Sequence, residues 1–504
     1  MRIGDNGNAA PSSTGLGGSY RLGVGAMAVA LRSIGCRTNQ EEAAALRAEF
    51  LSLGYSVVDD IEKADVVVVN TCSVTLHAES KTRRFIRSLS SAAPAAKILV
   101  TGCFAQQHGV LIQKYPGVEW VVGNADKHRI PSIIAASGSG AYLSDIDTGS
   151  PVFWSDNVTD PTASGRTRFS LKIQEGCDFR CAYCVVPMLR GPSRSAPKGR
   201  LVDTFKKAVD KGYKEIVLTG THIGQYSQFI GGDCISAVEL TDDAAVAEFN
   251  VNQCGRSQSG EQKGGLEALL TEFLKVGGDY RIRLSSVDPR DLTDTLMAMV
   301  GENPRVCDHL HVSVQSMCAE VLSRMDRPYG DLDLLTERLR GFREKYPAAG
   351  LGADFVVGHP GESDAMFEAT LRGVGAVGFT YGHVFRYSKR LGTKSAKMPG
   401  QIAESVKKRR SAALLELLRK SRENFLSLLF ACPLYIIVES EGPVVGVSGN
   451  YIRVEVPGVM ATRNTWMRVV VTGERRGGYC VAERLPRSGL KAGCIPQKTE
   501  TVYE

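Results

Sequence analysis

Residues 168–184 read RFSLKIQEGCDFRCAYC, and this stretch determines how the middle of the chain folds. The first ten residues predict a strand that ends in a cysteine. Two more thiols follow at once, so that Cys177, Cys181 and Cys184 are separated by three and then two residues. In a chain without signs of secretion, clustered cysteines indicate metal or redox chemistry rather than disulfide bonds.

Further strands follow this one, with helical stretches between them. The candidates are EIVLTG (215–220), RIRLSS (281–286), HLHVSVQS (309–316), GADFVVGHPG (352–361) and YGHVFRYS (381–388). Together these units predict an α/β fold, a partial parallel (β/α)6 barrel with its site at the carboxyl ends of the strands. Residues 227–264 are polar, glycine-rich and long for a barrel loop, which indicates an insertion.

The amino-terminal part predicts an open parallel α/β sheet. Its strand candidates are 28–35, 64–70, 97–103 and 120–124, and its helix candidates are 40–54 and about 76–90. Three of the strands end at a cysteine, namely Cys36, Cys72 and Cys103. Because the carboxyl ends of parallel strands meet at one edge of a sheet, these thiols are expected to converge. This favours a shared metal site over the alternative of three separate buried thiols.

The rest of the chain supplies a long helix and a second, smaller β fold. Residues 401–430 predict a basic amphipathic helix, and short strands from residue 433 onward predict a small β-barrel. The expected segments are a disordered tail (1–26), a cysteine-bearing domain (27–137), a linker (138–167), the barrel (168–400), the helix (401–430), the β-barrel (431–490) and a polar tail (491–504).

Composition narrows the class of protein. With 504 residues, 43% of them hydrophobic and 23% charged, the chain predicts a soluble protein of several domains. The chain contains no stretch of about eighteen apolar residues, so no membrane span is predicted. The net charge of +7 permits a nucleic-acid partner without requiring one. The glycine- and serine-rich start lacks the pattern of a signal peptide, and the thirteen cysteines are widely spread, which predicts a cytoplasmic location.

The spacing of the central triplet distinguishes among metal centres. Zinc sites with four ligands usually combine two CxxC-type pairs, and no further Cys or His stands at that spacing here. A [4Fe–4S] cluster has four irons, so three thiolates leave one iron open to a small molecule. An open iron suits a reaction centre, whereas an electron carrier is expected to supply four thiolates.

The ordered motifs of the chain resemble those of the radical S-adenosylmethionine superfamily and, within it, the methylthiotransferases. The resemblance covers about residues 28–425. It rests on GCRTNQEEA, NTCSVTLHAESKTRRFIR, TGCFAQ, EGCDFRCAYCVVPMLRGPSRS, IVLTGTHIGQY, RLSSVDP, HLHVSVQS, VVGHPGES and HVFRYSKRLGTKSAKMPGQ. The terminal module resembles the TRAM domain, a small RNA-binding barrel, most closely at GVSGNYIRVEV (446–456).

The resemblance implies two [4Fe–4S] clusters and S-adenosylmethionine as cofactors. Cys177, Cys181 and Cys184 would act as catalytic residues by holding the cluster that cleaves S-adenosylmethionine. Cys36, Cys72 and Cys103 would hold an auxiliary cluster that carries or supplies sulfur, and a second S-adenosylmethionine would give the methyl group. An external donor such as a flavodoxin or ferredoxin would supply electrons.

Three other residues are expected to contact the cofactor. The resemblance places Tyr183 near the adenine of S-adenosylmethionine, and Gly220 and Thr221 near its methionine part. Two of them have a simpler interpretation, because Tyr183 also suits a core aromatic and Gly220 a tight turn after a strand.

The motifs around Cys36 and Cys72, and HVFRYSKRLGTKSAKMP, most resemble the branch that acts on tRNA threonylcarbamoyladenosine. That branch implies transfer of a methylthio group to C2 of N6-threonylcarbamoyladenosine at position 37, with the tRNA anticodon stem-loop as partner. The alternatives are N6-isopentenyladenosine in tRNA and a ribosomal protein aspartate. A different class, a non-catalytic iron–sulfur protein that binds RNA or carries electrons, also stays open, as does a zinc-bound structural protein.

Several surface features are candidate RNA contacts. The basic stretches 80–87 and 406–410 suit phosphate binding, although a solvated helix face explains most charge runs. In the terminal module, Tyr451 is expected to stack on RNA and Arg453 to neutralise it. Two departures from the family pattern are Met317, where glycine is usual, and His359, where phenylalanine is common; His359 is expected to be a packing change.

Overall fold

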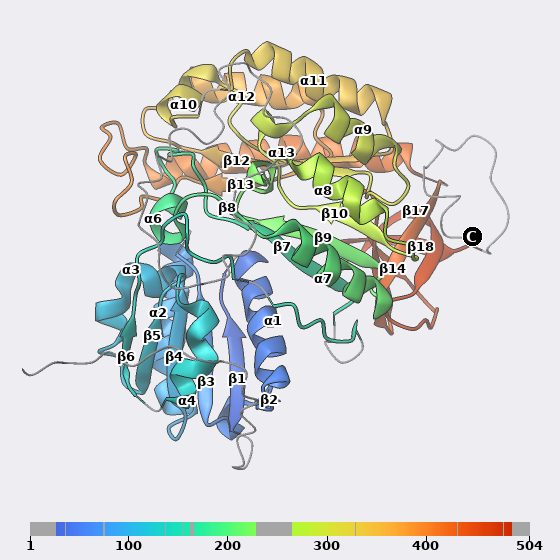
Figure 1. The fold of residues 1–504 in the computed structure, drawn as a ribbon. Coiled ribbons are helices and arrows are strands. Elements are labelled where there is room, and N and C mark those ends of the chain that lie inside the picture. Colours follow the sequence, from blue (N-terminus) through green and yellow to red (C-terminus); the bar gives the residue numbers. More distant parts are fainter. Residues whose placement is uncertain are drawn as a thin grey trace, which may run out of the picture.

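The computed structural model describes residues 27–35, 37–73, 76–136, 138–153, 155–161, 166–227, 265–327, 329–430, 432–476 and 478–485. The two predicted tails, nearly all of the predicted insertion and Cys36 lie outside these residues. Figure 1 shows three bodies along the chain: an amino-terminal sheet domain, a central barrel domain and a small carboxyl-terminal barrel.

The amino-terminal domain is an open sheet in which every strand pair is parallel. Its strands are β1 (Ala28–Ser33), β2 (Ser56–Val58), β3 (Val66–Thr71), β4 (Lys97–Gly102), β5 (Val118–Val122) and β6 (Gly140–Tyr142), in the order β2-β1-β3-β4-β5-β6. The central strand β3 reads VVVVNT and is buried throughout, because helices cover both of its faces. The open parallel α/β sheet predicted from the sequence is therefore confirmed.

Two layers of helices bury this sheet. The helices are α1 (Arg37–Ser52), α2 (Leu76–Ala92), α3 (Cys103–Ile112) and α4 (Ile130–Ala135). Apolar residues of α1 and α4 form one core with the sheet, and those of α2 and α3 form another. The structure adds two short strands to the prediction. One of them, β6, extends the sheet to Tyr142, into the segment expected to be linker.

The central domain is built on six parallel strands, all of which were predicted. They are β7 (Arg168–Glu175), β9 (Glu215–Gly220), β10 (Arg281–Leu284), β11 (His309–Gln315), β12 (Gly350–Val357) and β13 (Tyr381–Arg386). β7, β9 and β10 form one sheet and β11, β12 and β13 another, and isolated parallel bridges from Ile282 to Val306 and from Val287 to Val312 join them. A short strand, β8 (Arg194–Ser195), pairs antiparallel with β7 at the open edge. The result is the expected partial barrel.

Helices surround the outside of this barrel and bury one large core. They are α6 (Val186–Arg190), α7 (Lys198–Asp210), α8 (Gly265–Leu274), α9 (Asp294–Glu302), α10 (Ala319–Arg324), α11 (Leu332–Lys345) and α12 (Asp364–Val377). The predicted long helix is α13 (Glu404–Leu428), which packs along β13 and α12. Within the described residues, no helix is both long enough and apolar enough to span a membrane.

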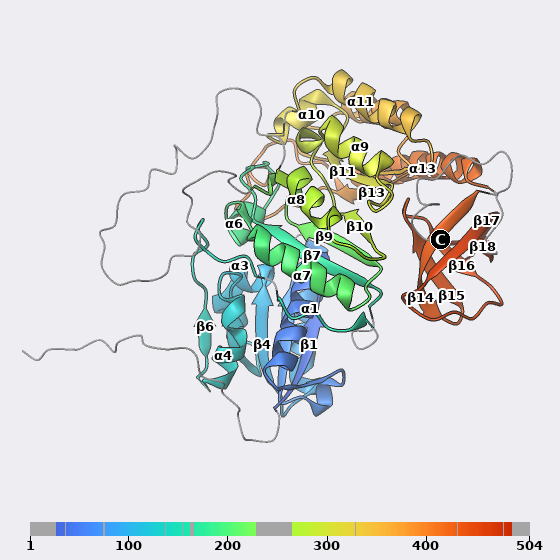
Figure 2. The same cartoon turned by 45° about the vertical axis from the view of Figure 1, so that its right-hand side comes forward.

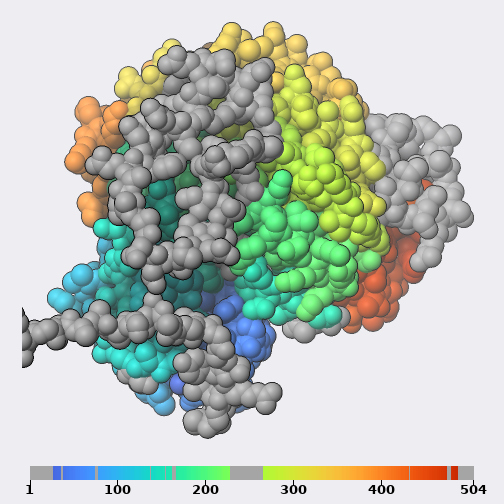
Figure 3. Space-filling model, in the orientation of Figure 1, coloured from blue at the N-terminus to red at the C-terminus, as the bar shows by residue number. Residues whose placement is uncertain are grey.

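The carboxyl-terminal module is a closed β-barrel, as the sequence predicted. Its strands are β14 (Pro433–Glu441), β15 (Val444–Ser448), β16 (Arg453–Val456), β17 (Trp466–Arg476) and β18 (Tyr479–Arg484), in the order β14-β15-β16-β18-β17. Figure 2 places it at the far end of the central strands from the amino-terminal domain, and the space-filling view shows it (red) at one side of the molecule (Figure 3).

Buried charges attach this module to the start of β10. The Arg281 guanidinium donates to the carbonyl oxygens of Tyr435 (3.1 Å) and Val447 (2.7 Å), and Arg283 donates to those of Ser448 (2.8 Å) and Gly449 (2.9 Å). Both arginines also pair with Glu215. Burial alone would raise the pKa of Glu215, but the charges of Arg283 and Arg281 outweigh it and hold that pKa well below its usual value. The module therefore closes the amino ends of the barrel strands.

Candidate active site and its two groups of cysteines

A cavity of about 540 Å³ runs through the inside of the central barrel. Cys177, Cys181 and Cys184 line it, and they come from the loop that follows β7. Residues from β9, β10, β11, β12 and β13 form the remaining walls. The cysteine triplet thus lies at the carboxyl ends of the strands, where the sequence predicted the site.

Each sulfur of the triplet lies beside a polar nitrogen. His222 Nδ1 is 3.6 Å from the Sγ of Cys177, Arg327 donates to the Sγ of Cys181 (3.3 Å), and the backbone N–H of Val186 donates to the Sγ of Cys184 (3.4 Å). Burial raises the pKa of the Cys184 thiol to about 12, and a bound metal ion would favour its thiolate form. Donors next to thiolates are the kind of partner that tunes an iron–sulfur centre.

The sequence analysis missed the acids behind these donors. Burial disfavours the charged form of His222, but hydrogen bonds with Asp291 and Cys177 raise its pKa to about 9. Arg327 pairs with Asp288, which is only 3% exposed. Arg290 also pairs with Asp288, at 2.7 Å. Only the fold brings these residues together, because they come from three different loops.

The described strand-end cysteines of the amino-terminal sheet lie side by side. Cys72 and Cys103 directly follow the adjacent strands β3 and β4, whose last residues, Thr71 and Gly102, are paired in register. Cys72 is 2% exposed and Cys103 is 6% exposed. A Cβ added at Gly35 would collide with the side chain of Cys72, so the chain immediately before Cys36 contacts Cys72. Cys36 itself is outside the described residues.

The two groups of cysteines are neighbours across the domain boundary. Cys103 packs against Leu189 and against Val185, the residue that follows Cys184. Cys103 and Ser73 also line a smaller cavity of about 170 Å³. This cavity and the barrel cavity have four lining residues in common, which are Thr38, Val186, Gly220 and Thr221. The cysteine triplet and Cys103 therefore line adjoining cavities.

The three expected cofactor contacts all line the barrel cavity. Tyr183 packs on Cys318, Val321 and Met325 and lines the cavity as well, so it is both a core aromatic and a wall residue. A side chain at Gly220 would approach the carbonyl oxygen of Gln174 to 2.8 Å, so close strand contact requires glycine there. Thr221 lies in the wall that the two cavities share.

The polarity of the cavity suits a hydrophilic cofactor. The Thr219, Thr221 and Ser285 hydroxyls line it, are buried, and have no hydrogen-bond partner among the residues that the structure describes. Buried hydroxyls without partners are costly unless a ligand satisfies them. Three thiols and three such hydroxyls in one cavity therefore fit an iron–sulfur cluster and a polar small molecule together.

A buried ion network fixes the amino-terminal domain to the barrel. Glu42 pairs with Lys172 (2.9 Å), Arg190 (2.7 Å) and Lys127. Glu175 pairs with Lys172 (2.8 Å) and Arg190 (2.6 Å). Burial would raise the pKa of Glu42, but Arg190, Lys127 and Lys172 hold it well below its usual value. The charges of this network therefore compensate one another at the junction between the amino-terminal domain and the barrel.

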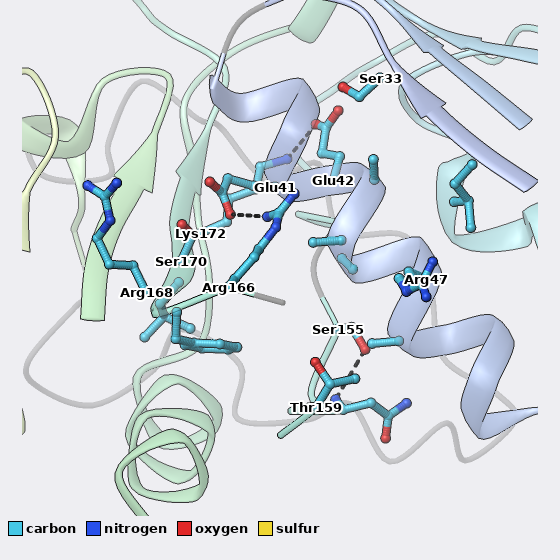
Figure 4. Close-up of a pocket in the computed structure, with 18 of the residues that line it drawn as sticks. Ser33, Glu41, Glu42, Arg47, Ser155, Thr159, Arg166, Arg168, Ser170 and Lys172 are labelled. Carbon is cyan, nitrogen blue, oxygen red and sulfur yellow. Dashed lines mark hydrogen bonds and ion pairs between the residues drawn. The ribbon is translucent and has the colours of Figure 1, made fainter. Parts of the chain in front are cut away.

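A separate pocket of about 460 Å³ lies beside this network, between α1 and β7 (Figure 4). In Figure 4, Lys172 reaches Glu42 at 2.9 Å and Arg166 lies 3.9 Å from Glu41. The lining of this pocket contains none of the predicted cysteines or cofactor contacts. We interpret it as a gap at the domain junction.

Arg190 is the residue whose loss should damage this junction most. We expect Arg190→Leu to lower the free energy of unfolding by about 3–5 kcal/mol, because it leaves the buried carboxylates of Glu42 and Glu175 undercompensated. Urea unfolding of the purified protein measures the change. Arg84→Leu, on the exposed side of α2, is the matched control and should cost less than about 0.5 kcal/mol. Equal stabilities for the two variants would contradict a role for the network.

The opposite end of the cavity is a polar floor, defined here as Arg283, His309, His311, Asp354, Tyr381 and His383. His311 Nε2 and His383 Nδ1 each lie 3.0 Å from the same oxygen of Asp354. Burial would raise the pKa of Asp354, but hydrogen bonds with the two histidines hold it well below its usual value. Sequence reasoning missed this floor. The motif HLHVS could have indicated it, because His309 and His311 are two residues apart in a strand and therefore lie on the same face.

Two RNA-contact expectations need correction. Tyr451 lies in the floor of the barrel cavity, stacked on His309 with ring centroids 4.7 Å apart, because the turn after β15 inserts beneath the barrel. It is therefore not on an outer RNA-facing surface of the module. In 406–410, Lys407 and Arg410 are buried and bonded to the Tyr387 carbonyl and to Glu362, whereas Lys408 and Arg409 are exposed.

The other surface expectations are compatible with the structure. Lys81, Arg84 and Arg87 are exposed on α2, and Arg453 is exposed on β16. His359 is fully buried, bonded to Ser395 (2.7 Å), and absent from the cavity lining, so it is a packing residue.

Comparison with known proteins supports the same division of the chain. A family model described as "Uncharacterized protein family UPF0004" matches residues 28–123, and one described as "Radical SAM superfamily" matches residues 171–374. The first covers most of the amino-terminal sheet, and the second covers the barrel with its cysteine triplet.

Curated relatives match over most of their length. The threonylcarbamoyladenosine tRNA methylthiotransferase MtaB of Thermotoga maritima is 34% identical over 391 residues, which is 77% of this chain and 81% of that protein. The MtaB protein of Bacillus subtilis is 32% identical over 460 residues, 90% of this chain and 94% of that protein. The tRNA-2-methylthio-N(6)-dimethylallyladenosine synthase of Fusobacterium nucleatum is 33% identical over 395 residues, 77% of this chain and 82% of that protein.

A partial parallel barrel with a CxxxCxxC triplet in its cavity defines this protein as a radical S-adenosylmethionine protein. The second group of strand-end cysteines and the extent of the matches narrow the class. The chain belongs to the MtaB-like radical S-adenosylmethionine methylthiotransferase family. The resemblance stated from the motifs is thereby confirmed.

Proposed function

We propose that this protein transfers a methylthio group to C2 of N6-threonylcarbamoyladenosine at position 37 of tRNA. The observation that carries the proposal is the contact between Cys103 and the segment that follows the cysteine triplet. Cys103 packs against the residue after Cys184, and four residues line both adjoining cavities. Formation of a carbon–sulfur bond by a radical route requires that one substrate atom reach both a radical source and a sulfur source. This arrangement allows it.

The assignment of ligands follows from the same geometry. Cys177, Cys181 and Cys184 would hold one [4Fe–4S] cluster, and Cys36, Cys72 and Cys103 a second. When bound, these groups and S-adenosylmethionine supply hydrogen abstraction, sulfur and the methyl group. The protein's own residues orient them: His222 and Arg327 contact thiol sulfurs, and Thr219, Thr221 and Ser285 offer hydroxyls to the cofactor.

The choice of substrate does not follow from overall identity. Relatives named for threonylcarbamoyladenosine and for dimethylallyladenosine match at 34% and 33%. The cavity floor supports the first of these, because imidazole, phenol and carboxylate groups line it. A dimethylallyl group is apolar and would add no hydrogen bond to these polar groups, whereas a threonylcarbamoyl group offers further donors and acceptors.

Nucleoside analysis of tRNA tests the proposal. The gene would be expressed in a bacterial strain that lacks its own methylthiotransferases, and digested tRNA would be analysed by mass spectrometry. We expect the methylthio derivative of threonylcarbamoyladenosine to appear. Methylthiolation of dimethylallyladenosine alone would overturn the choice of substrate. The absence of both products, from protein that contains its clusters, would overturn the proposed activity.

A further inference from the structure

The polar floor has a definite order of hydrogen bonds. Ionised Asp354 can only accept, so the nitrogens of His311 and His383 that face it must carry hydrogen. The other nitrogen of a neutral His311, Nδ1, then accepts from the Tyr381 hydroxyl (2.8 Å). That hydroxyl in turn accepts from His309 Nε2 (2.7 Å). The chain of bonds runs from His309 to Asp354 and assigns a tautomer to each ring.

His383 stands at the open end of this chain. Its side chain is 55% exposed, compared with 7% for His311 and 19% for Asp354. Its Nδ1 is engaged by Asp354, and its Nε2 has no hydrogen-bond partner among the described residues. Because His383 lines the barrel cavity, this nitrogen is available to a ligand there.

The surroundings of His383 suit a polar ligand. Arg283 is paired with Glu215 and Asp354 is bonded to two histidines, so both charges have partners within the protein, while His383 lines the cavity. A carboxylate bound at Nε2 would favour hydrogen on both nitrogens, so that His383 donates to it while Asp354 keeps the ring oriented. A carboxylate fits this position better than a hydrocarbon group does.

We propose that His383 Nε2 binds the carboxylate of the threonylcarbamoyl group, and that this contact selects the target adenosine. The inference rests on the proposed function and identifies the part of the site that distinguishes its substrate. Recognition of this kind requires the target nucleotide to leave the RNA stack and enter the cavity, as base-modifying enzymes generally require. Asp354 then acts as a positioning residue, because it touches His383 rather than the substrate.

Binding without turnover tests the proposal. The cluster-loaded protein with S-adenosylmethionine, kept without a reductant, would be titrated into fluorescent anticodon stem-loops that carry threonylcarbamoyladenosine, dimethylallyladenosine or adenosine. We expect His383→Leu to weaken binding of the first RNA by about 10- to 100-fold, the range for a hydrogen bond to a charged group. Binding of the other two RNAs should change less than about twofold. His383→Lys, which restores a cationic donor, should recover most of the loss.

Matched controls separate recognition from folding. His128→Ala removes an exposed histidine on the amino-terminal domain and should leave all three affinities unchanged. Because His383 is half-exposed, the His383→Leu variant should keep its iron content and its affinity for unmodified RNA. Equal weakening of all three RNAs, or no weakening of any, would overturn the proposal.

The two proposals fail in different ways. If the wild-type protein methylthiolates threonylcarbamoyladenosine in the tRNA assay but binds all three stem-loops equally, the activity stands and recognition through His383 is wrong. If that assay yields no such product while His383 still distinguishes the RNAs, the recognition stands and the reaction is wrong.

Discussion

Replacement of Cys103 by serine is expected to abolish methylthiolation while cleavage of S-adenosylmethionine continues. Serine nearly keeps the volume of cysteine, so the contacts with Val185 and Leu189 remain, but a hydroxyl is a poor ligand for iron. Iron content should fall from about eight to about four atoms per chain, because one of two [4Fe–4S] clusters is lost. Anaerobic reconstitution, iron and sulfide analysis, and chromatography of 5′-deoxyadenosine and of tRNA nucleosides measure the three effects.

The same pattern should follow replacement of Cys72 or Cys36, since one cluster needs all three thiolates. Cys480→Ser is the control, because this thiol is buried in the carboxyl-terminal barrel, far from both cavities. Loss of both clusters in Cys103→Ser would show that the two centres do not assemble independently. Unchanged iron content would show that the strand-end cysteines hold no cluster.

Replacement of Cys181 by serine should have the larger effect, complete loss of 5′-deoxyadenosine formation and therefore of the methylthio product. Cys181 is 7% exposed and Arg327 donates to its sulfur, so the variant removes a thiolate ligand and keeps an oxygen that can accept from Arg327. Iron content should again fall by about half, now with no cleavage of S-adenosylmethionine. The contrast between the two variants assigns each centre its role.

Cys432→Ser, at another buried thiol outside the cavities, should keep full iron content and full activity. Cleavage of S-adenosylmethionine by the Cys181→Ser protein at wild-type rate would contradict the assignment of the triplet. If Cys181→Ser simply unfolded the protein, its affinity for RNA would fall as well. Comparison with the RNA affinity of Cys103→Ser would reveal this.

The fold was predictable because its signals are local. Each barrel strand is a short apolar run with a turn after it, and the order of the strands follows from right-handed parallel connections. β2 was missed because three residues, SVV, give too little pattern, and β6 because GAY lies in a polar stretch. Register with neighbouring strands, rather than composition, makes these residues strands.

The site was predictable only in its cysteines. Their spacing and strand-end positions identify them from sequence, whereas no spacing assigns a role to Arg190, Arg327 or His383. The location of Tyr451 was not predicted, since an aromatic in an RNA-binding type of barrel suggests a place on its outer, RNA-facing surface. Its position depends on how two domains dock, which the sequence pattern of either domain does not specify.

The ion pairs of Glu42 with Lys172 and Arg190 have consequences for folding during synthesis and for the exchange of domains between relatives. During translation, the first domain emerges with Glu42 and Lys127 in place but without the cations contributed by residues 172–190. Its final form therefore waits for the next domain, and the two mature as one cooperative unit. Chimaeras that join the first domain of one relative to the barrel of another would fold only where both parents carry matching charges at this domain junction.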